Sequence, residues 1–103
     1  MTNSIARHTK LLEQYPDNEL ARFSLGKAYF DTQQYAAARE HFALALARKP
    51  DWMVVQILIG KCELALGNRE VARAALERAR QLAIEQQHDG PLAEVEQLLG
   101  ELQ

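Results

Sequence analysis

The side chains of this chain that could act as nucleophiles, acids or bases do not form a recognisable catalytic arrangement. The chain has one cysteine, Cys62, and three histidines, His8, His41 and His88. A catalytic thiol needs a neighbouring base and access to solvent, whereas the helical spacing around Cys62 indicates a core position. The histidines lack the i, i+4 spacing of paired metal ligands. The sequence therefore predicts no enzyme, no metal site and no bound cofactor.

Two lysines remain as candidates for ligand binding. Lys27 and Lys61 each follow a glycine within an apolar stretch. Their ammonium groups could meet acidic side chains or a carboxylate of a ligand. Alternatively, their aliphatic stems lie on apolar surface while the ammonium groups reach water. The sequence leaves both interpretations open.

Length and charge exclude several other classes of protein. A chain of 103 residues allows one domain. Its 12 Lys+Arg against 14 Asp+Glu give a net charge of -2 without long runs of either sign, which argues against nucleic acid as the main ligand. No apolar stretch reaches the roughly 18 residues that span a membrane, and the first residues do not resemble a secretory signal. These two observations predict a protein that does not bind membranes. The single cysteine cannot form an internal disulfide, so we expect the protein to be cytoplasmic.

The residues that could bind a ligand must be positioned by helices. Alanine and leucine far outnumber the β-branched residues, which favours an all-α fold. Apolar stripes at i, i+4 and i+7 and the turn residues between them predict six helices. They are expected over residues 3–14, 19–32, 35–48, 52–66, 69–86 and 91–102, with residues 88–91 as a loop.

Four of these helices belong to two copies of an internal sequence repeat. One constant shift along the chain aligns Leu25-Gly26-Lys27 with Ile59-Gly60-Lys61, and it aligns Ala38, Phe42 and Ala45 with Ala72, Leu76 and Ala79. A glycine inside a helix costs about 1 kcal/mol relative to alanine. Two glycines at equivalent positions therefore indicate a close approach, which we assign to the following helix packing through Ala38 and Ala72.

At these positions the chain resembles the tetratricopeptide repeat family, whose unit of about 34 residues is a pair of antiparallel helices. The first unit carries Leu25-Gly26, Tyr29, Ala38, Phe42, Ala45 and Pro50, whereas the second has Glu63 in place of the tyrosine. The resemblance implies a single domain over residues 1–103 made of helix-turn-helix repeats. Its parts are a half-repeat (3–18), two repeats (19–52 and 53–86) and a C-terminal capping helix (91–102). Leu99-Gly100 resembles the start of a further unit.

The resemblance also implies that the first helix of each pair lines a concave groove that holds a peptide or helix of another protein. The implied lining residues are Leu20, Phe23, Lys27, Phe30 and Asp31 from the first unit, and Val54, Ile57, Leu58, Lys61, Leu64 and Ala65 from the second. Some family members hold a terminal carboxylate with a clamp of lysine and asparagine. Phe23, Lys27 and Leu58 stand at three of those clamp positions, so we do not expect a clamp of this kind.

The helix expected over residues 52–66 is apolar on almost every side, which is typical of a helix that is buried on most sides. Its groove face must then be covered by the last helix of the chain, by a second copy or by a partner. Two functions follow from this. The chain is a non-enzymatic module that binds a peptide or helix of another protein, or it is a self-associating structural module that forms a homodimer through its fourth and last helices.

Overall fold

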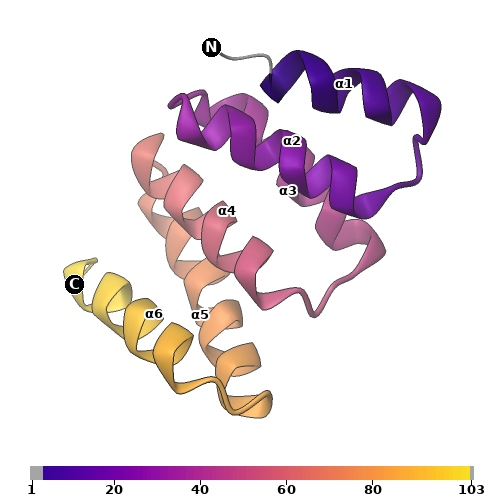
Figure 1. The fold of residues 1–103 in the computed structure, drawn as a ribbon. Helices are drawn as coiled ribbons and strands as arrows, with labels where there is room; N and C mark the ends of the chain where they lie inside the picture. The colour runs from indigo at the N-terminus through magenta and orange to yellow at the C-terminus, as the bar shows by residue number, and fades with distance from the viewer. Residues whose placement is uncertain (1–3, 103) are drawn as a thin grey trace.

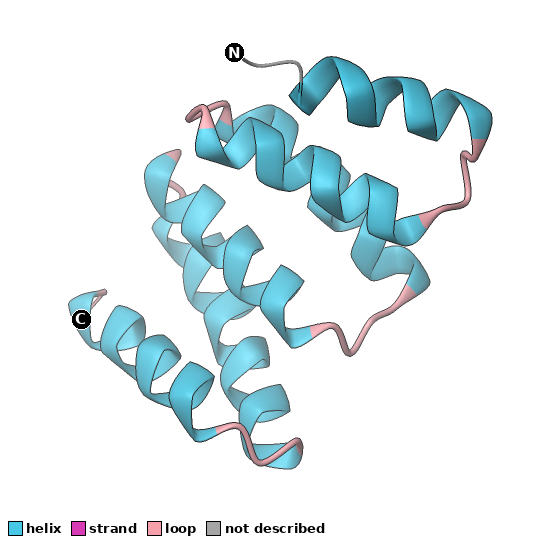
Figure 2. Ribbon diagram, viewed as in Figure 1, coloured by secondary structure: helices cyan, strands magenta, loops and turns pink. Residues whose placement is uncertain are grey.

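The computed structural model describes residues 4–102, and within them it contains six α-helices and no strand. The helices are α1 (Ser4–Gln14), α2 (Glu19–Asp31), α3 (Tyr35–Arg48), α4 (Met53–Ala65), α5 (Arg69–Glu85) and α6 (Asp89–Glu101). Figure 2 shows that short loops join them. The all-α prediction is confirmed, and the helix ends that can be compared lie within one turn of the expected ones. Residue 3, where the first helix was expected to begin, lies outside the described residues.

The helices stack in chain order, so that each one packs against the next. In Figure 1, α2 and α4 lie side by side in front of α3 and α5, and α1 and α6 flank the two ends of the stack. The first helices of the two hairpins therefore form one layer. This layer carries the residues that the resemblance assigned to a groove.

The two hairpins have the same interior. Ala38, Phe42 and Ala45 of α3 are fully buried, and so are Ala72, Leu76 and Ala79 of α5. The glycines of the first helices make room for the largest of these side chains. A Cβ atom at Gly26 would lie 2.7 Å from Cε1 of Phe42, and one at Gly60 would lie 2.6 Å from Cδ2 of Leu76. The close approach was correctly expected, but the atoms nearest to the two glycine positions belong to Phe42 and Leu76 rather than to Ala38 and Ala72.

Glu63 occupies the position of Tyr29 in the second hairpin and is buried. Arg39 Nη1 donates to Glu63 Oε1 at 3.1 Å, and Asn68 Nδ2 donates to the same oxygen at 2.8 Å. A buried carboxylate is tolerated when charged and polar partners satisfy it. Glu63 therefore joins α3 of the first hairpin to the α4–α5 turn of the second.

The C-terminal helix begins earlier than expected, at Asp89 instead of residue 91. Pro91 lies in its first turn, where a backbone N–H has no partner within the helix, so a proline costs little there. The expected start of a further unit at Leu99-Gly100 was wrong. His88 precedes α6 as Trp52 precedes α4, which puts Glu96 at the position of Gly26 and Gly60, and a Cβ at Gly100 would meet nothing within 4 Å.

Candidate functional site

The exposed side of the first helices forms a continuous candidate binding surface, which we call the α2–α4 face. Successive turns of each helix place its residues in a row. It consists of the predicted lining residues that remain accessible, together with Trp52. These are Leu20, Phe23, Lys27, Phe30 and Asp31 on α2, and Trp52, Val54, Lys61, Leu64 and Ala65 on or next to α4.

The α2 part of this face is apolar and aromatic. Leu20 is 65% exposed. The half-buried ring of Phe23 stacks on Trp52 with 5.0 Å between centroids, and the ring of Phe30 packs edge-on against Tyr35 at 5.4 Å. These contacts hold the rings in fixed orientations while one side of each remains partly accessible. Such rigid aromatic groups provide contact area at a small cost in conformational entropy.

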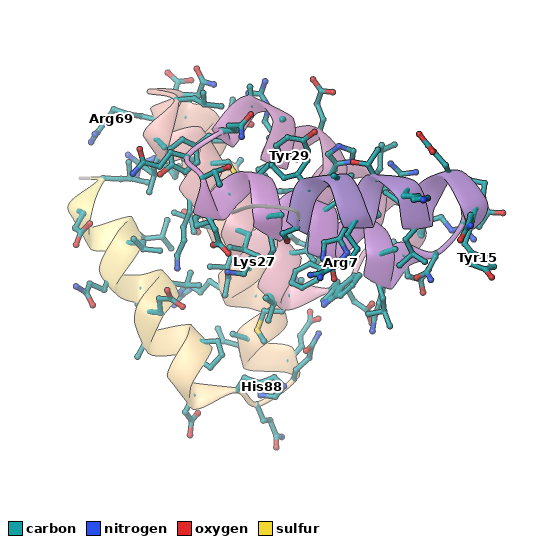
Figure 3. The ribbon with its side chains drawn as sticks, turned by 45° about the horizontal axis from the view of Figure 1, so that its top comes forward. Arg7, Tyr15, Lys27, Tyr29, Arg69 and His88 are labelled. Carbon is teal, nitrogen blue, oxygen red and sulfur yellow. The ribbon has the colours of Figure 1, made fainter. Side chains whose placement is uncertain are left out.

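Both lysines of the α2–α4 face pair with acids. Lys27 Nζ lies 3.2 Å from Asp31 Oδ1, one turn along α2, and Lys61 Nζ lies 2.6 Å from Glu94 Oε2 of α6. Lys27 also lies over the ring of Phe30, 5.8 Å from its centroid. Figure 3 shows its place on α2. Each ammonium group is partly accessible, so both pairs are in contact with solvent and weak.

Two predicted lining residues are buried and leave a ligand no access. Ile57 is 5% exposed and belongs to a core cluster with Val95 and Leu102. Leu58 is 8% exposed and packs with Phe42 and Cys62. The apolar character of α4 on nearly every side is therefore explained within the chain, because α6 packs beside it and covers the side that contains Ile57.

One part of the surface was not predicted from the sequence: a pocket of about 330 Å³ lies beside Trp52. At the edge of this pocket, the ammonium group of Lys49 lies over the Trp52 ring, 5.3 Å from its centroid. The full lining is Lys49, Asp51, Trp52, Met53, Val54, Gln86 and His88. Since these residues come from the α3–α4 loop with the first turn of α4 and from the distant α5–α6 loop, no local sequence pattern brought them together.

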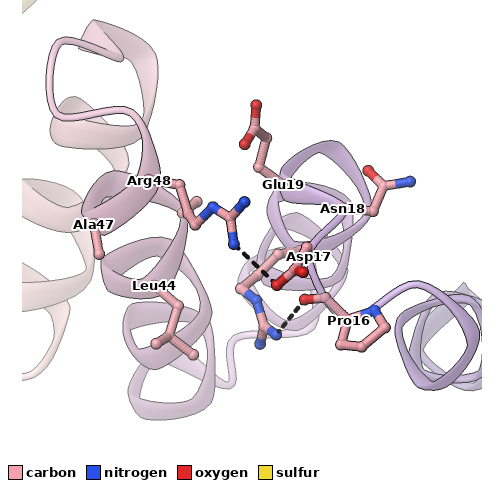
Figure 4. A pocket seen from close by; sticks show the side chains of 9 residues that line it. Pro16, Asp17, Asn18, Glu19, Leu44, Ala47 and Arg48 are labelled. Atoms are coloured by element: carbon pink, nitrogen blue, oxygen red, sulfur yellow. Dashed lines mark hydrogen bonds and ion pairs between the residues drawn. The ribbon is translucent and has the colours of Figure 1, made fainter.

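A second pocket, of about 190 Å³, lies between the α1–α2 loop and the C-terminal half of α3 (Figure 4). Its two arginines are already engaged. Arg48 Nη1 lies 3.0 Å from Asp17 Oδ1, and Arg22 Nη2 donates to the backbone oxygen of Pro16 at 3.3 Å. These contacts tie the loop to the first hairpin, so the pocket is best explained by packing.

Cys62 and His41, two of the titratable side chains singled out in the sequence, occupy structural positions. Cys62 is fully buried, and burial together with the neighbouring Glu63 raises its pKa to about 11 against a smaller opposite effect of Arg39. The thiol is therefore protonated at neutral pH and a poor nucleophile. His41 stacks on Tyr29, and burial and the nearby Arg22 lower its pKa. Within residues 4–102, no group of three or more His, Cys, Asp or Glu side chains could hold a metal ion.

Residues 2–54 match the tetratricopeptide repeat family. A TPR repeat-containing protein of Pseudomonas aeruginosa is 36% identical over 87 residues, which span 84% of this chain and 81% of the relative. The chain belongs to the tetratricopeptide repeat family. Members of this family are protein-interaction scaffolds, so the chain is a protein-interaction module of the tetratricopeptide repeat type.

Two solved structures share the tetratricopeptide repeat fold of this chain. The solution structure of a protein from Bordetella parapertussis is 32% identical, with a TM-score of 0.87 over 99% of this chain and 89% of that protein. The TPR2B domain of yeast Sti1, solved in a complex with pHsp70, is 17% identical with a TM-score of 0.87 over 97% of this chain and 80% of that chain. None of the described helices is both long and apolar enough to cross a membrane.

Proposed function

We propose that this protein binds a peptide or an amphipathic helix of another protein on the α2–α4 face, without catalysis and without a cofactor. The observation that carries the proposal is the exposure of Leu20 and Val54, at 65% and 46%, at equivalent positions of two neighbouring helices. Beside them lie the partly accessible rings of Phe23 and Trp52. Exposed apolar side chains grouped on one face are typical of interaction sites.

The chemistry of the α2–α4 face favours a ligand with apolar anchors flanked by acidic residues. Apolar side chains of the ligand would lie against Leu20, Phe23 and Val54. An acidic side chain could replace Asp31 or Glu94 as the partner of Lys27 or Lys61, because both existing pairs are accessible to solvent. The complex of the TPR2B domain with pHsp70 supports binding of another protein by the shared fold.

The alternative, a homodimer through α4 and α6, has less support. It was based on an apolar face of α4 that a second copy would cover. In this structure α6 packs beside α4, where Val95 and Leu102 share a core cluster with Ile57, so that requirement is met within one chain.

The binding experiment starts from peptides selected on the wild-type chain from a random-sequence display library, and NMR chemical-shift changes then locate the binding surface. We expect the largest changes at Leu20, Phe23, Lys27, Val54 and Lys61. Leu20→Asp should weaken binding about tenfold or more, because it places a charge in an apolar contact. Leu44→Asp is the matched control, since Leu44 is 50% exposed on α3. Shift changes confined to α3 and α5 would overturn the proposal.

The lysines can be tested with the same selected peptides. Lys27→Glu combined with Lys61→Glu should weaken binding of acidic peptides, because like charges then face each other. The fold should be nearly unaffected, since the ion pairs of both lysines are partly exposed. A large fall in melting temperature would instead show that the two lysines are structural, and equal affinity for acidic and neutral peptides would exclude the charge recognition.

A further inference from the structure

The two ends of the helical stack are complementary halves of one repeat unit. Helix α1 packs on α2 as α3 packs on α4, since Leu11, Leu12 and Ala21 share a cluster just as Ala45, Leu46 and Val55 do, one repeat later. Helix α1 is therefore the second helix of a unit whose first helix is absent from the described residues. Helix α6 follows α5 as α4 follows α3, so it is a first helix without a described second helix.

The α2–α3 hairpin shows how the two helices of a unit meet. His41 of α3 stacks on Tyr29 of α2 with 5.5 Å between ring centroids, and its Nδ1 lies 3.4 Å from Arg22 Nη1. Phe42 fills the space above Gly26. Residues 22, 26 and 29 of the first helix therefore face residues 41 and 42 of the second.

This register can be transferred to the two end helices. His88 immediately precedes α6 as Asn18 immediately precedes α2, so Leu92, Glu96 and Leu99 hold the three first-helix positions. Arg7 and His8 of α1 lie one repeat before His41 and Phe42 and hold the two second-helix positions. If α1 of one copy takes the empty place beside α6 of another, His8 lies at Glu96 as Phe42 lies at Gly26. Arg7 then takes the place of His41, between the turns that carry Leu92 and Leu99 and within reach of Glu96.

The two end helices, α1 and α6, carry opposite charges. Helix α6 carries Asp89, Glu94, Glu96 and Glu101 and no basic residue. Helix α1 carries Arg7 and Lys10 against a single acid, Glu13, and all three are exposed. Neither Arg7 nor Lys10 takes part in an ion pair among the described residues, 4–102.

The receiving site is an open crevice of about 320 Å³ between α5 and α6. Its lining consists of Arg73, Glu77, Arg80, Glu96, Leu99 and Gly100. Glu96 is held at the crevice by an exposed contact with Arg80, at 3.3 Å, and Leu92 and Leu99 are only half-buried. A helix docked here would cover both leucines.

We propose that this face binds a second copy of the same chain head to tail, with α1 of one copy in the α5–α6 crevice of the next. Position 96 cannot repeat the close contact of Gly26 with Phe42, because Glu96 has a side chain there. An ion pair between Arg7 and Glu96 holds the two copies together instead. The two contacting surfaces differ, so each added copy leaves a free α1 and a free α5–α6 crevice, and assembly continues beyond the dimer. A small, polar interface of this kind is weak and sensitive to salt.

The experiment is analytical ultracentrifugation of the full chain over a wide concentration range at low and high salt. We expect the average mass to rise past that of a dimer as the concentration approaches about 1 mM at low salt, and to fall with added salt. Arg7→Glu and Glu96→Arg should each remain monomeric. Arg78→Glu and Glu85→Arg are the matched controls, because they make the same charge changes at exposed sites outside the crevice, and they should assemble like the wild type.

Mixing the two blocked variants gives the decisive result. Arg7→Glu keeps the original crevice and Glu96→Arg keeps the original α1, and the two substituted surfaces carry the same ion pair with its charges exchanged. The mixture should therefore assemble beyond the dimer, although neither variant does so alone. Monomers of the wild type at every concentration would overturn the proposal and show that the polar end helices act as solubilising caps. Dimers that do not grow and that persist in Arg7→Glu would overturn it in favour of a symmetric contact. None of these outcomes depends on peptide binding to the α2–α4 face.

Discussion

The hairpins α2–α3 and α4–α5 share one interior but present different surfaces. Gly26 lies against Phe42 in the first hairpin, and Gly60 lies against Leu76 at the same positions of the second. On the outside, Phe23 is half-buried and contributes to the candidate binding surface, whereas its counterpart Ile57 is buried beside α6. The repeat spacing thus determines contacts within a hairpin, while the neighbouring helix determines which of its residues remain accessible.

The position shared by Tyr29 and Glu63 shows a second difference. Tyr29 stacks on His41 within its own hairpin. Glu63 instead binds Arg39 of the preceding hairpin and Asn68 of the following turn. A repeat position can therefore hold an aromatic ring or a carboxylate, provided that the buried polar atoms find partners.

The largest expected effect comes from substitutions that test whether the interiors of the two hairpins contribute equally to stability. Phe42→Ala should lower the free energy of unfolding by about 3–5 kcal/mol, and Leu76→Ala by about 2–4 kcal/mol, because each leaves a cavity and the phenylalanine leaves the larger one. Chemical denaturation followed by circular dichroism measures both. Leu44→Ala, at an exposed position of α3, should change stability by no more than about 0.5 kcal/mol. A larger loss of unfolding free energy for Leu76→Ala than for Phe42→Ala would mean that the second hairpin contributes more to stability than the first.

These interior contacts are the part of the fold that the sequence predicts well. Apolar stripes at helical spacing and the paired glycines identified the six helices and the close approach within each hairpin. They did not identify the atoms at that approach. Ala38 and Phe42 share one face of α3, and only the actual distance between the helices shows that the phenylalanine ring fills the space above Gly26.

The second prediction concerns the glycines themselves. Gly26→Ala should destabilise by about 1–2 kcal/mol, because a rigid ring occupies the space of the new Cβ and outweighs the helix preference of alanine. Gly60→Ala should cost less, because the Leu76 side chain, with Cδ2 at 2.6 Å and Cγ at 2.8 Å from the new Cβ, can rotate away where a phenyl ring cannot. Denaturant titration of both variants measures which substitution costs more stability.

The control for the glycine comparison is a double-mutant cycle. In the Phe42→Ala background the ring is gone, so Gly26→Ala should become neutral or stabilising, by up to about 1 kcal/mol. Additive effects of the two substitutions would contradict the contact between Gly26 and Phe42.

The candidate site was less predictable than the fold. Spacing placed Phe23, Lys27 and Phe30 on one face of α2, but it gave no information on the helix beside α4. The burial of Ile57 depends on α6, whose residues come much later in the chain. The pocket at Trp52 joins two loops and requires the same long-range packing.

The third prediction compares two arginines at equivalent positions, Arg39 and Arg73. Arg39→Met leaves the buried Glu63 with Asn68 alone and should cost about 1–2 kcal/mol, a moderate value because the Arg39 side chain is 35% exposed. Arg73 donates to the backbone oxygen of Leu102 at 2.9 Å, and Arg69 donates to the same oxygen at 3.1 Å. Arg73→Met should therefore cost only about 0.5 kcal/mol. Thermal and denaturant unfolding measure both, and equal losses would show that Glu63 does not depend on Arg39.

The smallest expected effect is the pH dependence of stability that His41 contributes. It concerns the first hairpin alone, because the second hairpin has Ala75 at the equivalent position. The lowered pKa of His41, caused by burial and by Arg22 against the opposing charge of Glu40, means that the unfolded chain binds a proton more readily than the folded one. The stability contributed by neutral His41 is thus present above its ordinary value of 6.5 and is lost as the pH falls below it.

His41→Ala should therefore lose less stability than the wild type when the pH is lowered from about 8 to about 5. Urea midpoints of both proteins at several pH values give the difference directly. His8 and His88 are present in both proteins, so their contributions cancel in this comparison. Parallel pH profiles would mean that protonation of His41 does not affect its stacking on Tyr29, and a wild type that gains stability in acid relative to the variant would reverse the sign of the linkage. A steeper acid loss in the wild type would assign this pH dependence to the α2–α3 hairpin, where His41 and Arg22 meet.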